Sequence, residues 1–127
     1  MDLLLDTHAA LWWWRASPLL TVAARRGIED AGIIYVSVAS AYEIANKHRL
    51  GKLDDIGDPA RKYPALMIEH AFVELKITAP HALRAGRLSG EHRDPFDRLI
   101  AAQALEDGLI VVTRDPALAA FGCKVLW

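Results

Sequence analysis

Acidic side chains stand where a parallel sheet would bring them together. Three of them follow short apolar or β-branched stretches, and a fourth lies near the start of a long helical pattern; they are Asp6, Glu43, Asp115 and Asp97. In open parallel sheets, functional groups gather beyond the carboxyl ends of the strands. Carboxylates that meet there repel one another unless cations lie between them, and hard oxygen ligands suit Mg²⁺ or Mn²⁺. These positions predict a divalent-metal site.

Most of these acids also fit a purely structural role. A DPFD sequence makes Asp94 a good helix N-cap, and Ser40 with Glu43 matches a capping box. Taken singly, Asp94, Glu43 and Asp115 fit capping better than catalysis. Asp6 differs, because an acid at the mouth of a central buried strand is costly without a partner. The pattern of residues by itself leaves the structural and the metal-binding interpretation open.

The elements that must position these acids alternate between strands and helices. Runs rich in apolar or β-branched residues predict strands at 1–5, 33–38, 72–77, 109–112 and 123–127. Helical spacing, caps and breakers predict helices at 9–15, 18–30, 40–50, 58–71, 79–88 and 94–106, with one more turn from 115. In 58–71, Pro64 is expected to kink or split the helix.

Alternating strands and helices, with strands that are solidly apolar, indicate a parallel sheet covered on both faces. We therefore expect a three-layer α/β/α sandwich around a mainly parallel sheet of four or five strands. No internal repeat, low-complexity tract or linker interrupts the chain, so residues 1–127 are expected to form one domain.

Composition limits the class of protein. The chain has 127 residues, 53% hydrophobic and 24% charged, which is typical of a globular domain with a real core. Its single cysteine, Cys123, can form neither an internal disulfide nor a thiolate metal site. No stretch suits a membrane span or a secretory signal, so a soluble, cytoplasmic protein is expected. The net charge of −1 becomes mildly basic once the four acids are assigned to a metal, which permits nucleic-acid binding.

Four blocks of sequence resemble one branch of the VapC-type PIN-domain ribonucleases, the toxins of bacterial toxin–antitoxin pairs. The blocks are LLLDTHAALW at 3–12, SVASAYEIANK at 37–47 followed by RLGKL at 49–53, HRDPFDRLIAAQA at 92–104, and TRD at 113–115. They occur in the family's order and spacing and cover essentially the whole chain. The resemblance implies a PIN-like fold and metal-dependent hydrolysis of RNA phosphodiester bonds, with 5′-phosphate and 3′-hydroxyl products.

Carried over position by position, the resemblance makes Asp6, Glu43 and Asp97 the core metal-binding acids. Asp115 matches the fourth, more variable acid. Asp94 is an additional acid typical of this branch, and we interpret it as a helix cap in the outer shell of the metal site. The family's usual metal is Mg²⁺, with Mn²⁺ as a substitute. The resemblance also implies a homodimer that is held inactive by a small VapB-like antitoxin.

Neighbouring polar and basic residues are expected to support the site. Arg93, Arg98 and Arg114 flank the acids in sequence and are predicted to contact RNA phosphates, which dominate nucleic-acid affinity. Thr7 and Thr113 either hydrogen-bond the ligating acids or water, or are ordinary turn hydroxyls.

Three consecutive tryptophans, Trp12, Trp13 and Trp14, fall within an expected helix. Successive helical residues point about 100° apart, so all three cannot enter one core stripe. We expect at least one of them to face a partner or solvent, and we favour a protein contact, with a second copy or the antitoxin, over base stacking.

Other classes of protein share an acidic pocket on an α/β frame. Receiver domains share two features: an acidic pair after the first strand and a lysine after the last core strand. Here one acid, Asp6, follows the first strand, and the TRD block offers no lysine. A haloacid-dehalogenase-like phosphatase needs a second aspartate where His8 stands. A PIN-like fold that binds RNA or protein without cleaving is the remaining alternative, and the presence of all four acids argues against it.

Overall fold

The computed structural model describes residues 1–127 apart from the side chain of Asp54. Five short strands form one sheet in the order β3-β2-β1-β4-β5, with every neighbouring pair parallel. The strands are β1 (Leu3–Leu5), β2 (Ile34–Ser37), β3 (Val73–Leu75), β4 (Ile110–Val112) and β5 (Val125–Leu126). The predicted parallel sandwich is confirmed, and the sheet has the larger of the two expected strand numbers.

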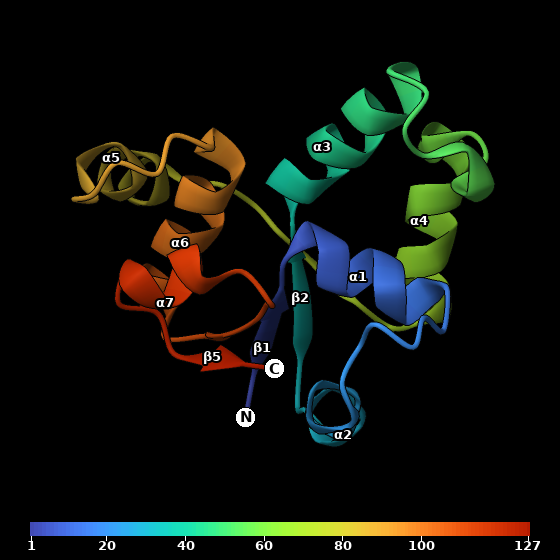
Figure 1. Ribbon diagram of the computed structural model, residues 1–127, viewed down its shortest axis with the longest axis horizontal. Helices are drawn as coiled ribbons and strands as arrows, with labels where there is room; N and C mark the ends of the chain where they lie inside the picture. The colour runs from blue at the N-terminus through green and yellow to red at the C-terminus, as the bar shows by residue number, and fades with distance from the viewer.

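Helices cover both faces of the sheet (Figure 1). They are α1 (Thr7–Trp14), α2 (Val22–Asp30), α3 (Val38–Arg49), α4 (Pro59–Glu69), α5 (Ala79–Arg87), α6 (Pro95–Asp107) and α7 (Pro116–Ala120), with a short 3₁₀ helix at Asp54–Ile56. Figure 1 shows α5, α6 and α7 on one side of the sheet and α1, α2 and α4 on the other. No helix in the described part of the chain combines the length and the apolar character that crossing a bilayer requires.

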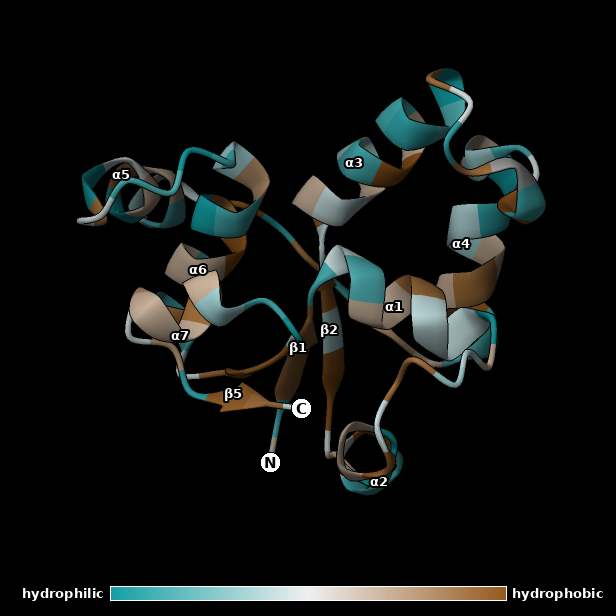
Figure 2. Ribbon diagram, in the orientation of Figure 1, coloured by the Kyte–Doolittle hydropathy of each residue, from teal (hydrophilic) through white to brown (hydrophobic). Residues whose placement is uncertain are grey.

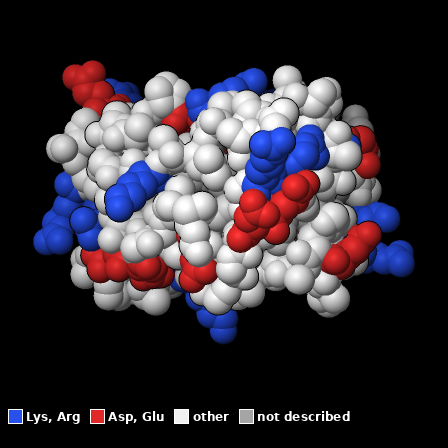
Figure 3. Space-filling view, turned by 90° about the horizontal axis from the view of Figure 1, so that it is seen from below, with Lys and Arg blue, Asp and Glu red and all other residues white. Residues whose placement is uncertain are grey.

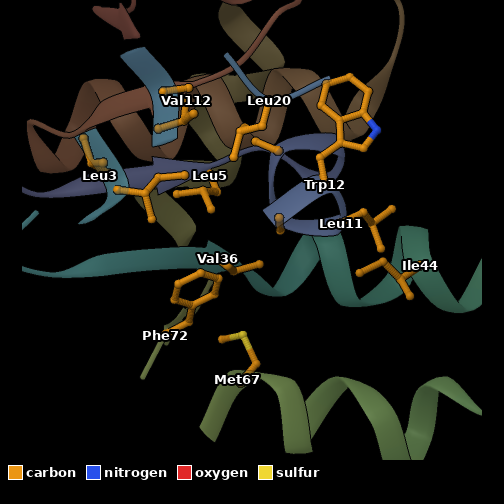
Figure 4. Packing of buried hydrophobic residues seen from close by; sticks show 14 of the residues in the cluster. Leu3, Leu5, Leu11, Trp12, Leu20, Val36, Ile44, Met67, Phe72 and Val112 are labelled. Carbon is orange, nitrogen blue, oxygen red and sulfur yellow. The ribbon is translucent and has the colours of Figure 1, made fainter. Parts of the chain in front are cut away.

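Two hydrophobic clusters fill the space between these layers. One joins residues of β1, β2 and β4 to α1 to α4 and includes Leu3, Leu5, Leu11, Val36, Ile44, Met67, Phe72 and Val112 (Figure 4). The other joins the alternate strand residues to α6 and α7 and includes Leu4, Ile100, Val111 and Leu118. Successive strand side chains point to opposite faces, so the three leucines of β1 serve both clusters and are all fully buried. Figure 2 shows this as brown central strands against hydrophilic colour along much of α3.

A side chain caps the amino end of each of the seven α-helices by accepting a hydrogen bond from a backbone N–H of the first turn. The capping residues are Asp6, Thr21, Ser37, Asp58, Thr78, Asp94 and Asp115. Such caps satisfy N–H groups that have no partner within the helix. Because these capping residues can be recognised in the sequence, most helices begin where the sequence predicts.

Three predicted helix starts are wrong, because a different residue provides the cap. The helix predicted from residue 9 begins at Thr7, with Asp6 as its cap. The helix predicted from residue 18 begins at Val22, since Thr21 accepts from the Ala24 N–H at 3.0 Å. The helix predicted from residue 40 begins at Val38, directly after β2, with Ser37 as its cap. Glu43 therefore lies in the second turn of α3 and not in its first.

The predicted Ser40 capping box is likewise absent. The Ser40 hydroxyl is buried and lies 2.8 Å from the Thr7 hydroxyl, so it ties α3 to α1. Pro64 does not split its helix: α4 runs continuously from Pro59 to Glu69 with Pro64 inside it.

Each of the three tryptophans has a different partner within the chain, but Trp13 and Trp14 are only partly buried, so the expected contact with another protein stays a prediction. Trp12 is 9% exposed and packs on Trp127 at a centroid distance of 5.6 Å. The Trp13 indole donates to His70 Nδ1 at 3.1 Å, and the half-buried Trp14 ring packs edge-on against Tyr63. Helix α1 is thus covered on several sides, by the end of the chain and by α4.

Candidate metal centre

An acidic pocket lies at the carboxyl edge of the sheet, where β1 and β4 end. Strand β1 is the central strand of the sheet. The chain passes from β1 to β2 on one side of it, and β4 lies on the other side, so the strand order reverses at β1. Ligand sites of open α/β sheets form at such switch points. The pocket has a volume of about 400 Å³, and its wall contains five carboxylates: Asp6, Glu43, Asp94, Asp97 and Asp115. All four predicted metal ligands are brought together there.

Asp6 is the most buried of these acids, at 6% exposed. It follows β1 and caps α1, where one carboxylate oxygen accepts from the Ala9 N–H at 2.8 Å. The other oxygen accepts from the Thr113 hydroxyl at 2.6 Å. Burial raises the pKa of Asp6 to about 6, and the charges of Glu43 and Asp115 add to this effect, while the two hydrogen bonds oppose it.

Thr113 joins two of the acids. It follows β4, is buried, donates its hydroxyl proton to Asp6, and accepts from the Asp115 N–H at 3.0 Å. Asp115 in turn caps α7 by accepting from the Ala117 N–H at 2.9 Å. Thr7 lines the pocket, but its hydroxyl pairs with Ser40. Of the two predicted supporting threonines, only Thr113 contacts an acid directly.

Asp97 lies in the first turn of α6 and reaches the pocket from the other side. Its Oδ2 accepts a hydrogen bond of 2.8 Å from His92 Nε2. Burial raises the pKa of Asp97 to about 6; the His92 hydrogen bond opposes the shift, and the charges of Asp94 and Asp115 add to it. Asp94 caps α6 through its Oδ1, which accepts from the Phe96 N–H at 2.9 Å. Both pKa values are raised mainly because the carboxylates are buried, and neighbouring acids add to the effect.

Glu43 has a cation beside it. Lys47 Nζ lies 3.5 Å from Glu43 Oε2 and 3.2 Å from His8 Nε2. Burial and the charge of Lys47 lower the pKa of His8, so its neutral ring accepts from the ammonium. The spacing of Glu43 and Lys47, four residues apart on a helix, is the sequence signal for this contact.

The three arginines predicted to hold phosphate differ in placement. Arg114 lines the pocket, with its guanidinium 4.7 Å above the Trp12 ring. Arg93 is exposed and lines a neighbouring hollow with His92. Arg98 instead donates to the backbone carbonyls of Ala85, Leu88 and His92, so its guanidinium is occupied within the fold. We therefore leave Arg98 out of the proposed RNA contacts.

The donor set fits a hard divalent cation. The pocket wall holds five carboxylates and one arginine, with Lys47 beside Glu43, so negative charge is in excess. Carboxylate oxygens are the ligands that Mg²⁺ and Mn²⁺ prefer. By contrast, the edge at the amino ends of the strands carries Lys and Arg side chains intermixed with Asp and Glu (Figure 3).

The PIN domain family matches residues 3–122. Ribonuclease VapC22 of Mycobacterium tuberculosis (strain ATCC 25618 / H37Rv) is 34% identical over 116 residues, which are 91% of this chain and 88% of that protein. The FitAcB structure from Neisseria gonorrhoeae has a TM-score of 0.70 at 20% identity and covers 97% of this chain and 95% of its own. A toxin–antitoxin complex from Klebsiella pneumoniae has a TM-score of 0.60 at 21% identity, covering 89% and 86%. The structural likenesses show the fold.

Proposed function

We propose that this chain, which belongs to the PIN-domain family and there to the VapC-type ribonucleases, hydrolyses RNA phosphodiester bonds as a metal-dependent endoribonuclease toxin. The observation that carries the proposal is the convergence of Asp6, Glu43, Asp97 and Asp115 on one pocket at the sheet's switch point. The similarity to a ribonuclease over most of the chain supports the same activity.

In this proposal the four acids hold Mg²⁺, or Mn²⁺ in its place. Bound divalent cations supply an acidified water, a polarised phosphoryl group and a stabilised leaving oxygen. Asp6 is held on one side by the α1 amide and on the other by Thr113, which also orients Asp115. These contacts fix the carboxylates before the substrate arrives, which reduces the cost of ordering the site during the reaction.

Basic side chains around the pocket would hold the RNA backbone. Arg114 reaches the pocket wall and rests on the Trp12 ring, and the exposed Arg93 extends the positive charge along the neighbouring hollow. Lys47 adds a third cation beside Glu43. Phosphate contacts of this kind position a nucleic acid without reading its sequence.

Asp6→Asn is the direct test of the activity. We expect the intact chain to cleave RNA with Mg²⁺ or Mn²⁺, and both a chelator and Asp6→Asn to abolish cleavage. The matched control is Asp30→Asn, which neutralises an exposed acid at the end of α2 and should leave cleavage unchanged. Equal cleavage by Asp6→Asn would indicate a contaminating nuclease and remove the support for the site.

We further propose that the chain acts in the cytoplasm as a homodimer and is inhibited by a small VapB-like antitoxin. The Klebsiella structure that shares this fold is a toxin–antitoxin complex, which supports such a partner. The pocket's excess of carboxylates suits a basic side chain from that partner. Co-purification with the product of a neighbouring short gene, followed by loss of cleavage in the complex, would support this; a purified chain that never binds such a product would contradict it.

A further inference from the structure

His92 brings a nitrogen ligand to the edge of the acidic pocket. Its Nε2 lies 2.8 Å from Asp97 Oδ2. The ligating atoms of His92, Asp94 and Asp97 all lie within 4.8 Å of one another, which marks them as the candidate metal-binding group among the described side chains. The resemblance in sequence assigns no role to His92.

We propose that His92, Asp94 and Asp97 form a second divalent-cation site, which takes a transition metal such as Mn²⁺ in preference to Mg²⁺. The inference rests on the proposed function, since Asp97 would be shared with the first metal site. Asp97 is suited to that role because it lines the acidic pocket while its Oδ2 faces His92.

The spacing of the ligands suits octahedral coordination. With metal–ligand distances of about 2.1 Å, neighbouring ligands of an octahedral ion lie about 3 Å apart. The separation of 2.8 Å between His92 Nε2 and Asp97 Oδ2 is that of a hydrogen bond, and it is close to the ligand spacing that an ion would need in place of the proton. Asp94 uses Oδ1 for the cap of α6, which leaves its Oδ2 for an ion.

His92 is already held in place. Its ring packs edge-on against Phe121 at a centroid distance of 5.8 Å, and its backbone carbonyl accepts from Arg98 Nη1 at 2.9 Å. The Arg98 guanidinium also lies over the Phe121 ring, at 5.3 Å. Because these contacts fix the imidazole before binding, little conformational freedom is lost when it ligates an ion.

The surroundings leave room for the waters that such an ion keeps. A hollow of about 560 Å³ adjoins the acidic pocket, and His92, Asp115 and Phe121 are among the residues that line it. The two hollows share Asp115 and Pro116, so an ion beside His92 would lie next to the first site. His92 retains 33% of its side-chain exposure, which gives the ion access from solvent.

The choice of metal follows from the imidazole. Both ions prefer oxygen ligands, but Mn²⁺ is a transition metal that also accepts an imidazole nitrogen, whereas Mg²⁺ takes oxygen ligands almost exclusively. For Nε2 to ligate, the proton it now donates to Asp97 must leave Nε2 while Nδ1 takes one up, so the ring stays neutral. One nitrogen among oxygens therefore favours Mn²⁺ over Mg²⁺ at this site and leaves the all-carboxylate site able to hold either.

The test is Mn²⁺ binding to the intact chain, followed by electron paramagnetic resonance. We expect two bound ions and a nitrogen coupling to bound Mn²⁺ in the pulsed spectrum. His92→Gln keeps an N–H that can donate to Asp97 but removes the imidazole, so it should abolish the coupling and weaken the second Mn²⁺ at least about tenfold. The matched control is His8→Gln, which removes the other pocket histidine and should keep the coupling.

Asp6→Asn separates this inference from the proposed function. It should remove the first ion and leave the nitrogen-coupled ion in place. A coupling that survives His92→Gln, or a single bound ion without nitrogen coupling in the intact chain, would overturn the second site and leave the nuclease proposal standing. A chain that binds no divalent cation at all would overturn both.

Discussion

At the residue scale, capping and metal binding are compatible roles for the same aspartates. Asp6, Asp94 and Asp115 each use one carboxylate oxygen to accept from a helix N–H. The second oxygen takes no part in the cap, although that of Asp6 accepts from the Thr113 hydroxyl. The positive end of the helix dipole favours the charged carboxylate. The sequence presents capping and ligation as alternatives because a cap pattern looks the same in both cases.

The Thr113 hydroxyl is predicted to matter for metal binding although it lies behind the acids. Thr113→Val removes the 2.6 Å bond to Asp6 and the contact to the Asp115 amide while preserving shape. Loss of such a supporting contact typically costs about 10–100-fold in metal affinity or activity. Calorimetric titration with Mn²⁺ and the cleavage rate should both show this loss.

Thr113→Ser is the matched control, since it keeps the hydroxyl and loses only a methyl group. It should retain most of the affinity and rate. Equal losses in the serine and valine variants would mean that packing, and not the hydrogen bond, is what Thr113 contributes.

The raised pKa values of Asp6 and Asp97, both about 6, predict a dependence on pH. A protonated carboxyl group binds cations poorly, so cleavage at fixed metal concentration should fall as the pH drops through about 6. Higher Mn²⁺ concentrations should shift the midpoint to lower pH, because the ion competes with the protons. A rate that is constant from pH 7 down to pH 5 would contradict the assignment of these acids.

The same shifts affect stability in the absence of metal. A carboxyl whose folded pKa lies above its unfolded value of 3.8 stabilises the folded state fully below that value, and this contribution is lost as the pH rises through about 6. At neutral pH the ionised Asp6 therefore lowers the free energy of unfolding, which an ion in the pocket would restore.

At the scale of elements, Arg98 holds the segment between α5 and α6. Its guanidinium donates to carbonyls of Ala85, Leu88 and His92. Arg98→Gln should cost about 2–3 kcal/mol of unfolding free energy, as expected when charged hydrogen bonds to a half-buried loop are lost. Urea denaturation measures this loss.

The exposed Arg93→Gln is the control for that prediction and should change stability by less than about 0.5 kcal/mol. The two variants should also differ in RNA affinity: Arg93→Gln should weaken binding and flatten its salt dependence. If Arg98→Gln left stability unchanged but weakened RNA binding, the account would be wrong, and Arg98 would contact RNA phosphate as the sequence predicts.

Strands and most helices could be predicted from local sequence, and the reasons are visible in the structure. The three leucines of β1 and both valines of β4 are buried, on opposite faces of the sheet, and solid apolar runs of this kind are typical of central strands. The start of α3 was missed because Ser37 and Ser40 are both good caps and only the three-dimensional contact of Ser40 with Thr7 decides between them.

At the scale of the whole molecule, the sheet order and the partners of distant residues lay beyond sequence reasoning. Hydropathy shows that β1 is buried but not that it lies between β2 and β4. The sequence did not show that Trp12 packs on Trp127 and Trp14 on Tyr63 of α4, because these contacts come from distant parts of the chain. His92 was missed as a contact of Asp97, although the two lie five residues apart, because the segment joining them is not one helix.

The central claim is that the carboxylates of the pocket are placed to hold divalent cations at a cost in stability. Thermal unfolding of the intact chain and of Asp6→Asn, each with and without Mn²⁺ at neutral pH, tests it most directly. Without metal, Asp6→Asn should unfold at the higher temperature, because it removes a buried charge. Its amide oxygen can still accept from the Ala9 N–H, and its NH₂ can donate to the Thr113 hydroxyl in a bond of reversed direction. Mn²⁺ should raise the Tm of the intact chain and raise that of the variant much less. A less stable variant that Mn²⁺ stabilises as much as the intact chain would contradict the account.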